Sequence, residues 1–398
     1  MDKPSVAAPA PPGPPVPVLA ADPGAQPQAS AGTRTARDRR LDLMRFFGIL
    51  VVIIAHAHPP EWLFQLRNFG TPLLVAASAL TYATIYQSRP LHALPFLRKR
   101  LAKLILPAWG FLTFFFALFA CIAVVTGQAF PFPAKKIVTS YAFYSGIGYV
   151  WIFKVYIALA LITPAAIAIS KRHPGRAGYF ATLVAVYAAY EVALPWVPAD
   201  VLADRTSIIH AFVLTLPPYM LLFLYGLKMR SFTDRQLLAI GGTALTVFLA
   251  ASWLMARGGA EAFAIQDYKY PPRAYYLVYG FAAIHFIYLA CRHLGRLASA
   301  RPVAWVAENS LWIYLWHILA IYIWRTLDLP TEEKLRWFIP DLLFLLGFGI
   351  ALTYLQGRVS ARMPFRTRTR SRVDRATVVL ASPVAEDPSA RGVREPTA

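Results

Sequence analysis

The sequence predicts an all-α fold: a polytopic membrane bundle of about ten transmembrane helices with both termini in the cytoplasm. Composition, a series of long apolar segments and the placement of Lys and Arg lead to this prediction. The chain has 398 residues, of which 57% are hydrophobic and only 15% charged, and its mean hydropathy is +0.47. Such values are typical of multi-pass membrane proteins and not of soluble domains.

Ten apolar segments follow one another along the chain. Most reach the roughly 20 residues that a helix needs to cross about 30 Å of hydrocarbon. The first is short, and Pro59-Pro60 marks its end. The predicted limits are 42–58, 69–86, 104–126, 149–169, 178–197, 209–227, 236–255, 274–291, 305–324 and 337–355.

The segments on either side of this region have a different composition. Residues 1–33 are rich in Pro and Ala and contain no aromatic residue, and such a segment cannot bury enough apolar surface to fold. We set the limit of this segment at residue 38. We predict a disordered cytoplasmic leader there, a membrane domain over 39–357, and a basic, disordered cytoplasmic tail over 358–398. The leader lacks the apolar stretch of a cleavable signal peptide, so the first span would serve as the insertion signal.

Lys and Arg alternate in density between successive loops, which predicts the orientation. If the amino terminus is cytoplasmic, most basic residues fall inside, which is the arrangement that multi-pass proteins favour. This distribution also accounts for the +20 net charge without nucleic acid. We therefore expect a protein of the inner (plasma) membrane in contact with membrane lipids. The smaller outside set is Arg67, Lys135, Lys136, Arg205, Arg257, Lys269, Arg273, Arg325, Lys334 and Arg336.

The first span contains the most informative group of polar residues. Arg45 and His56 are eleven residues apart, about three helical turns, so they lie on one face and roughly 16 Å apart along the axis. Asp42 falls within about 40° of His56 on the same period. The plainer explanation is a local Asp42–Arg45 ion pair plus a hydrogen-bonded histidine. The alternative is a face turned towards a polar crevice, since ionisable groups in spans are often functional.

Two further groups of residues stand out. Arg98, Arg100 and Lys103 lie in a basic loop at the base of the third span, where Arg100 and Lys103 could jointly hold a phosphate. The positive-inside rule alone would also place bases there. In the ninth span, Ser310 and His317 share a stripe and Tyr314 lies beside His317, for which an interhelical hydrogen bond is the plainer explanation.

Taken together, these residues resemble acyltransferase family 3, the integral-membrane family that includes bacterial O-acetyltransferases of polysaccharides. The resemblance covers most of residues 39–355. Each motif alone is weak evidence for the family, and their order along the chain is stronger evidence. It rests on these segments: Asp42, Arg45 and His56; Phe69-Gly70-Thr71-Pro72-Leu73 through Ser78; Arg98 to Lys103 with Pro107; Tyr149-Val150-Trp151-Ile152-Phe153; and Ser310 to Tyr314 with His317. Two positions depart from the family pattern, Lys103 in place of an Arg and Ala79 in place of a Gly.

The resemblance implies transfer of an acyl group, usually acetyl, from cytoplasmic acyl-CoA to a saccharide hydroxyl on the outer side. His56 would then be the general base or a transient acyl carrier, with Arg45 and Asp42 beside it in the catalytic set. Arg98, Arg100 and Lys103 would hold acetyl-CoA. Ser310, Tyr314, His317 and Trp151 would contact substrate or serve structure. Lys in place of Arg loses the planar fork that binds phosphate best.

The expected acceptor is a free or lipid-linked saccharide in exopolysaccharide modification, with glycan-assembly proteins as further partners. No metal-ligand spacing occurs, so no metal is expected. A transporter or flippase that uses intramembrane Arg and His is the main alternative, although no repeat symmetry of the kind common in transporters is visible. A non-catalytic partner in glycan assembly is a third possibility.

Overall fold

The computed structural model describes residues 38–86, 88–173, 175–204, 207–327 and 334–362, and these residues form helices and no strand. All of the predicted leader except Asp38, and most of the predicted basic tail, lie outside the described residues. In chain order the elements are α1 (Arg39–Ile54), α2 (Glu61–Leu66), η1 (Arg67–Phe69), α3 (Gly70–Tyr86), α4 (Ala93–Thr126), α5 (Ala134–Tyr141), α6 (Trp151–Arg172), α7 (Arg176–Ala193), η2 (Leu194–Trp196), α8 (Ala199–Ala203), η3 (Ile209–Leu214), α9 (Leu216–Met229), α10 (Asp234–Arg257), η4 (Ile265–Tyr268), α11 (Ala274–His293), α12 (Gly295–Ala298), α13 (Arg301–Thr326) and α14 (Lys334–Arg362).

The all-helical membrane fold is confirmed. Within the described ranges, nine helical stretches are long and apolar enough to cross a membrane, and they correspond to the second to tenth predicted spans. The first predicted span corresponds to α1, which has only 16 residues because the chain turns away before Pro59-Pro60. Pro217-Pro218 also coincide with a break, since a π-helical turn (η3) gives way there to α9.

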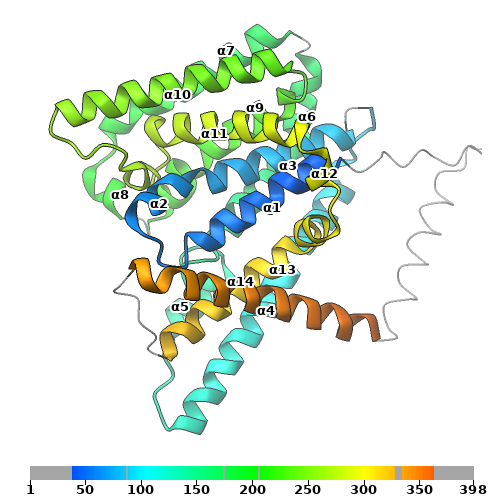
Figure 1. Ribbon diagram of the computed structural model, residues 1–398, viewed down its shortest axis with the longest axis vertical. Helices are drawn as coiled ribbons and strands as arrows, with labels where there is room; N and C mark the ends of the chain where they lie inside the picture. Colours follow the sequence, from blue (N-terminus) through cyan, green and yellow to red (C-terminus); the bar gives the residue numbers. More distant parts are fainter. Residues whose placement is uncertain (1–37, 87, 174, 205–206, 328–333, 363–398) are drawn as a thin grey trace, which may run out of the picture. The chain divides into compact units, whose positions relative to one another are not determined.

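Although it is short, α1 is the helix around which the others are arranged. It packs against α3, α11, α13 and α14, and Figure 1 shows it between α3 and α13. Leu43, Met44 and Ile53 along it are fully buried. Asp38 begins the helix by accepting a hydrogen bond from the backbone amide of Arg40, which satisfies one of the free donors of the first turn. Both ends of α1 are therefore held by surrounding protein.

The basic segment before the third predicted span is helical and not a loop. α4 begins at Ala93 and runs for 34 residues, so Arg98, Arg100 and Lys103 lie in its first three turns. Pro95 is tolerated because proline within the first helical turn has no amide partner to lose. The three bases are thus held by a continuous helix. α14 likewise extends to Arg362, five residues into the predicted tail.

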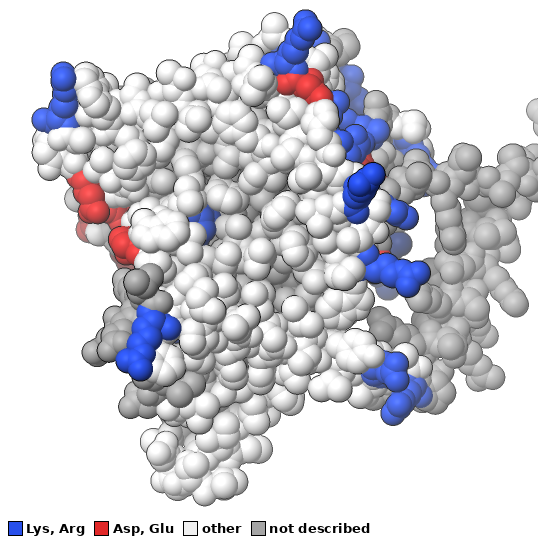
Figure 2. Space-filling view, in the orientation of Figure 1, with Lys and Arg blue, Asp and Glu red and all other residues white. Residues whose placement is uncertain are grey.

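Basic side chains gather at one end of the bundle. In Figure 2 most of the visible Lys and Arg lie on the side where α1 begins in Figure 1. We call this the basic end; it is formed by Arg39, Arg40, Arg98, Arg100, Lys171, Arg172, Arg176, Lys228, Arg230, Arg235 and Arg292. His56 lies at the other end of α1. The uneven distribution that the sequence predicts is therefore present in the folded chain.

α3 and α9 approach each other closely at Ala79 and Gly226. A Cβ placed on Gly226 of α9 would lie 2.7 Å from the Cβ of Ala79 in α3. A methyl group on a helix cannot move aside without moving the backbone. Small residues let membrane helices approach closely, and here the glycine stands on α9 while α3 carries the alanine.

We predict that Gly226→Ala destabilises the protein by about 1–3 kcal/mol, the usual cost of overpacking, and that adding Ala79→Gly restores most of the loss. The thermal unfolding midpoint of the purified protein in detergent measures both effects. Gly110→Ala is the matched control, because its added Cβ meets nothing within 4 Å. If the double variant were no more stable than Gly226→Ala alone, this contact would not explain the loss.

Candidate active site

His56 lies just past the end of α1, in a turn that the local sequence creates. The amides of Ala55 and His56 still bond to carbonyl groups of the last helical turn. His58 then adopts a φ of 48°, and Pro59-Pro60 prevents the helix from continuing. His58 is fixed by a 2.8 Å contact between its Nδ1 and Asp341 of α14. The end of α1 is therefore anchored, and the His56 ring projects from a defined position.

A second histidine contacts His56. Nδ1 of His56 lies 3.0 Å from Nε2 of His317, and the two rings stack with centroids 5.2 Å apart. Nδ1 of His317 contacts the backbone carbonyl of Tyr314 within α13. Because a carbonyl oxygen only accepts, Nδ1 of His317 carries a proton, and Nε2 of the neutral ring accepts from His56. Nε2 of His56 is left with its lone pair available to act as a base.

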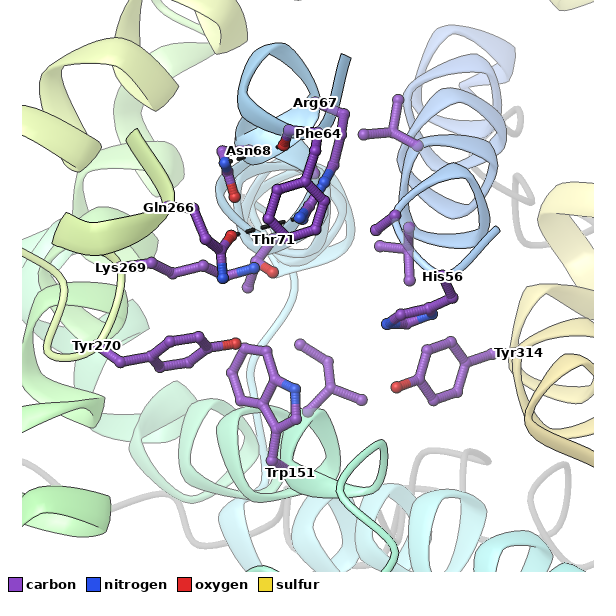
Figure 3. A pocket seen from close by; sticks show the side chains of 15 residues that line it. His56, Phe64, Arg67, Asn68, Thr71, Trp151, Gln266, Lys269, Tyr270 and Tyr314 are labelled. Atoms are coloured by element: carbon purple, nitrogen blue, oxygen red, sulfur yellow. Dashed lines mark hydrogen bonds between the residues drawn. The ribbon is translucent and has the colours of Figure 1, made fainter. Parts of the chain in front are cut away.

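This ring lines a cavity of about 180 Å³. Figure 3 shows His56 and Tyr314 on one side, Lys269 and Tyr270 on the other, and Trp151 closing the cavity opposite Phe64. The lining comes from the end of α1, from α2, η1, α3, α6 and α13, and from the segment before α11. A neighbouring pocket of about 420 Å³ shares His56 and Trp151 and extends past Tyr149 to Lys136 and Arg325. His56 thus borders two neighbouring pockets.

Two buried cations face the same cavity. Arg67 and Lys269 are each only 7% exposed, and no carboxylate in the described part of the chain lies within ion-pair distance of either. Arg67 stacks on Phe64 at 4.0 Å and donates a hydrogen bond to Gln266. Burial, with the nearby charge of Arg67, lowers the pKa of Lys269 to about 7. The cavity is therefore strongly electropositive.

Arg45 does not line this cavity. Its guanidinium is 3.3 Å from the carboxylate of Asp42 and donates a 2.6 Å hydrogen bond to Thr81 of α3. Asp42 itself is 1% exposed. The structure thus shows the local pair that the sequence predicts, but the expectation that Arg45 and His56 share one crevice is not met by the cavity around His56. From the body of α1, the residues that line this cavity are Val51 and Val52, both of them apolar.

Arg45 instead belongs to a group of residues nearer the basic end. Arg100 lies over the ring of Tyr82 at 5.6 Å, and its Nε is buried without a hydrogen-bond partner. Arg45 and Arg100 both lie close enough to Tyr82 and Tyr156 to interact with them electrostatically. Arg100 is thus partly buried, whereas Arg98 and Lys103 are exposed on the surface of α4. Arg45 and Arg100 could together meet an anionic donor.

The remaining predicted site residues divide into two groups. Tyr314, His317 and Trp151 all lie beside His56, and Tyr314 donates a hydrogen bond to the carbonyl of Tyr149. Ser310, two turns earlier in α13, is half-buried and lines neither pocket near His56. In the part of the chain that the structure describes, no group of three or more His, Cys, Asp or Glu could hold a metal ion.

Arg67, Lys269, Gln266 and Tyr270 are site residues that the sequence does not single out. From the sequence, Arg67 and Lys269 belong only to the set of outside loop charges. One usable signal was present: each lies in a loop expected at the same end of the bundle as His56, next to aromatic or amide side chains. Which of the ten outside bases turns inward depends on tertiary packing.

Comparison with protein families decides the classification. A family model described as an acyltransferase domain (Acyl_transf_3) matches residues 38–356. The chain belongs to acyltransferase family 3. No curated protein and no solved structure matches it significantly. Family membership and the apolar helices together make the chain a multi-pass membrane acyltransferase, and His56 with its partners lies within the matched region.

For this acyltransferase we predict that His317→Leu lowers the acyl-transfer rate by about 10²-fold or more, within the range that general bases contribute. His317→Gln should retain much more activity, because its amide oxygen can accept from Nδ1 of His56 where Nε2 does now. The pH–rate profile should change shape in the Leu variant, since the His56 tautomer is no longer fixed. Equal activity and identical pH profiles in both variants would show that His317 only fills space.

Proposed function

We propose that the chain is an O-acyltransferase that moves an acetyl group from acetyl-CoA to a saccharide hydroxyl. The observation that carries the proposal is Nε2 of His56, a nitrogen whose lone pair is left available by the His317 contact and which borders a polar cavity. The basic end supports the assignment of the donor side. Under the positive-inside rule it would face the cytoplasm, where acyl-CoA is made.

In the proposed reaction, Nε2 of His56 takes the proton of the acceptor hydroxyl as the oxygen attacks the thioester carbonyl. The carbon–sulfur bond then breaks, the acyl ester forms, and the imidazolium returns its proton to the departing thiolate, giving free CoA. Lys269 and Arg67 stand near enough to His56 to act on it electrostatically, so they also favour the negative charge that develops on the carbonyl oxygen. A covalent acyl-imidazole is the other route open to the same nitrogen.

The donor would bind from the basic end with its phosphates at Arg100, Lys103 and Arg98. The buried Nε of Arg100, which lacks a partner, supports this assignment because a buried donor favours a bound acceptor. The distance from Arg45 to His56 is roughly 16 Å along α1. The pantetheine arm of CoA is long and thin, and it would carry the acyl group along this helix.

We predict that His56→Ala abolishes acyl transfer while acetyl-CoA still binds with near-native affinity, since the donor phosphates lie at the other end of α1. Purified protein in nanodiscs, labelled acetyl-CoA and a panel of saccharide acceptors provide the assay. Label retained on the wild-type protein without acceptor would identify the acyl-imidazole route. Undiminished transfer by His56→Ala would contradict the assignment, and uptake of an acceptor without label transfer would favour a transporter.

We predict that Arg100→Ala raises the KM for acetyl-CoA about tenfold or more, as expected from losing a charge-assisted hydrogen bond worth ~1.5–3 kcal/mol, with little change in kcat. Arg358→Ala, an exposed arginine of α14 outside both groups of site residues, is the matched control. The donor assignment would be wrong if Arg100→Ala left the KM for acetyl-CoA unchanged.

A further inference from the structure

Among the residues that the structure describes, no carboxylate forms an ion pair with the two cations of the cavity beside His56. Arg67 and Lys269 come from different elements, η1 and the segment before α11, and both are more than nine-tenths buried. Glu61 acts on Arg67 electrostatically, but its side chain is exposed and the two groups do not form an ion pair. Nε of Arg67 has no hydrogen-bond partner at all. Burying unpaired charge costs several kcal/mol per ion, so such a pair is stabilised when an anion joins it.

The same cavity also contains an unused acceptor. Asn68 is 1% exposed, and its amide nitrogen donates to the carbonyls of Phe64 and Gln65. Its Oδ1 is buried and has no hydrogen-bond partner among the described residues, and Asn68 is one of the residues that line the cavity. A buried amide oxygen of this kind is satisfied by a hydroxyl group. The ligand that fits would combine an anionic group with hydroxyl groups.

The aromatic lining and the size of the cavity narrow the choice further. Trp151, Tyr270 and Tyr314 supply ring faces around it, and Trp151 and Tyr270 meet edge to face at 5.4 Å. Such faces pack against the C–H surface of a sugar ring. About 180 Å³ is less than the ~300–1,000 Å³ of pockets that take drug-sized ligands, so the space suits one monosaccharide unit. The neighbouring 420 Å³ pocket leaves room for the adjoining unit.

From these observations we infer that the acceptor is an acidic saccharide, whose carboxylate or phosphate binds between Arg67 and Lys269 while a hydroxyl of the same unit meets Nε2 of His56. This inference rests on the proposed function and names its acceptor class. Arg67 lines the cavity, and its planar guanidinium can make a directional contact with one oxygen of the anion. Lys269 supplies a compact charge from the side of the cavity opposite His56.

Protonation of Lys269 gives the inference a second consequence. The titratable and charged groups that face Lys269 are Arg67, His56, Tyr270 and Tyr314. Because the pKa of Lys269 is lowered to about 7 by burial and Arg67, a bound anion would raise it and binding would take up a proton. Affinity for the anionic sugar should therefore fall as the pH rises from about 6 to about 8.5.

Binding tests the inference without turnover. The full-length protein in nanodiscs is heated with methyl glucuronide, glucose 6-phosphate or methyl glucoside at equal ionic strength. We expect the unfolding midpoint to rise with one or both anionic sugars and not with the glucoside, and the rise to vanish in Lys269→Met and in Arg67→Gln. Lys135→Met, an exposed lysine of α5, is the matched control and should keep the rise. Equal effects of charged and neutral sugars would overturn the inference, and the two anionic sugars distinguish carboxylate from phosphate.

Turnover separates failure of this inference from failure of the proposed function. With acetyl-CoA, release of free CoA should show a kcat/KM at least tenfold higher for the anionic acceptor, and Lys269→Met should reduce this preference through KM. A preference unaffected by Lys269→Met would overturn the inference. So would a Lys269-dependent preference for succinyl-CoA over acetyl-CoA, which would place the anion on the acyl group. No CoA release with any acceptor would contradict the proposed function, and the binding result would still decide the anion site.

Discussion

The hydrogen bond from Nδ1 of His56 to Nε2 of His317 is the contact on which the rest of the candidate site depends. It joins two helices whose contact residues are 261 positions apart in the chain. It also fixes the tautomers of both rings. Nδ1 of His317 donates its proton to a carbonyl, so Nε2 of His317 accepts from Nδ1 of His56, and Nε2 of His56 keeps a free lone pair. A histidine that works as a base needs a partner that holds its tautomer, and here another imidazole takes the part that a carboxylate often plays.

The geometry of α1 makes this contact possible. A helix of 16 residues is too short to span a membrane by itself, yet it is packed on several sides by longer helices. Its early stop at Pro59-Pro60 leaves His56 below the level of the surrounding loops, where α2, η1 and the segment before α11 can close over it. If α1 continued as a helix past this point, α2 and η1 could not turn back and contribute Phe64 and Arg67 to the lining. The shortness of α1 therefore creates the cavity.

The spans, the clustering of bases at one end and the pairing of Asp42 with Arg45 could be predicted from the sequence because each depends on local pattern. His317 could be singled out as a polar residue in an apolar helix, but its partner could not, since helix pairing is a tertiary property. The same limit explains why Arg45 and His56 do not share a cavity. Their spacing predicts one face of the helix, but Arg45 bonds to Thr81 of α3, whereas His56 faces a cavity that Lys269 from the segment before α11 also lines. A shared face does not guarantee a shared cavity.

The charges of the cavity and the tautomer of His56 support one another. Protonating His56 would add a third positive charge beside Arg67 and Lys269, so these neighbours favour the neutral ring that can accept a proton. An anionic group between the two cations would remove part of that repulsion, which would make it easier for His56 to hold the proton taken from a hydroxyl. An acidic acceptor would thus assist the base that acts on it, and a neutral analogue with the same hydroxyl would lack this help. On this argument the two cations contribute to the reaction through the charge on the substrate as well as through binding.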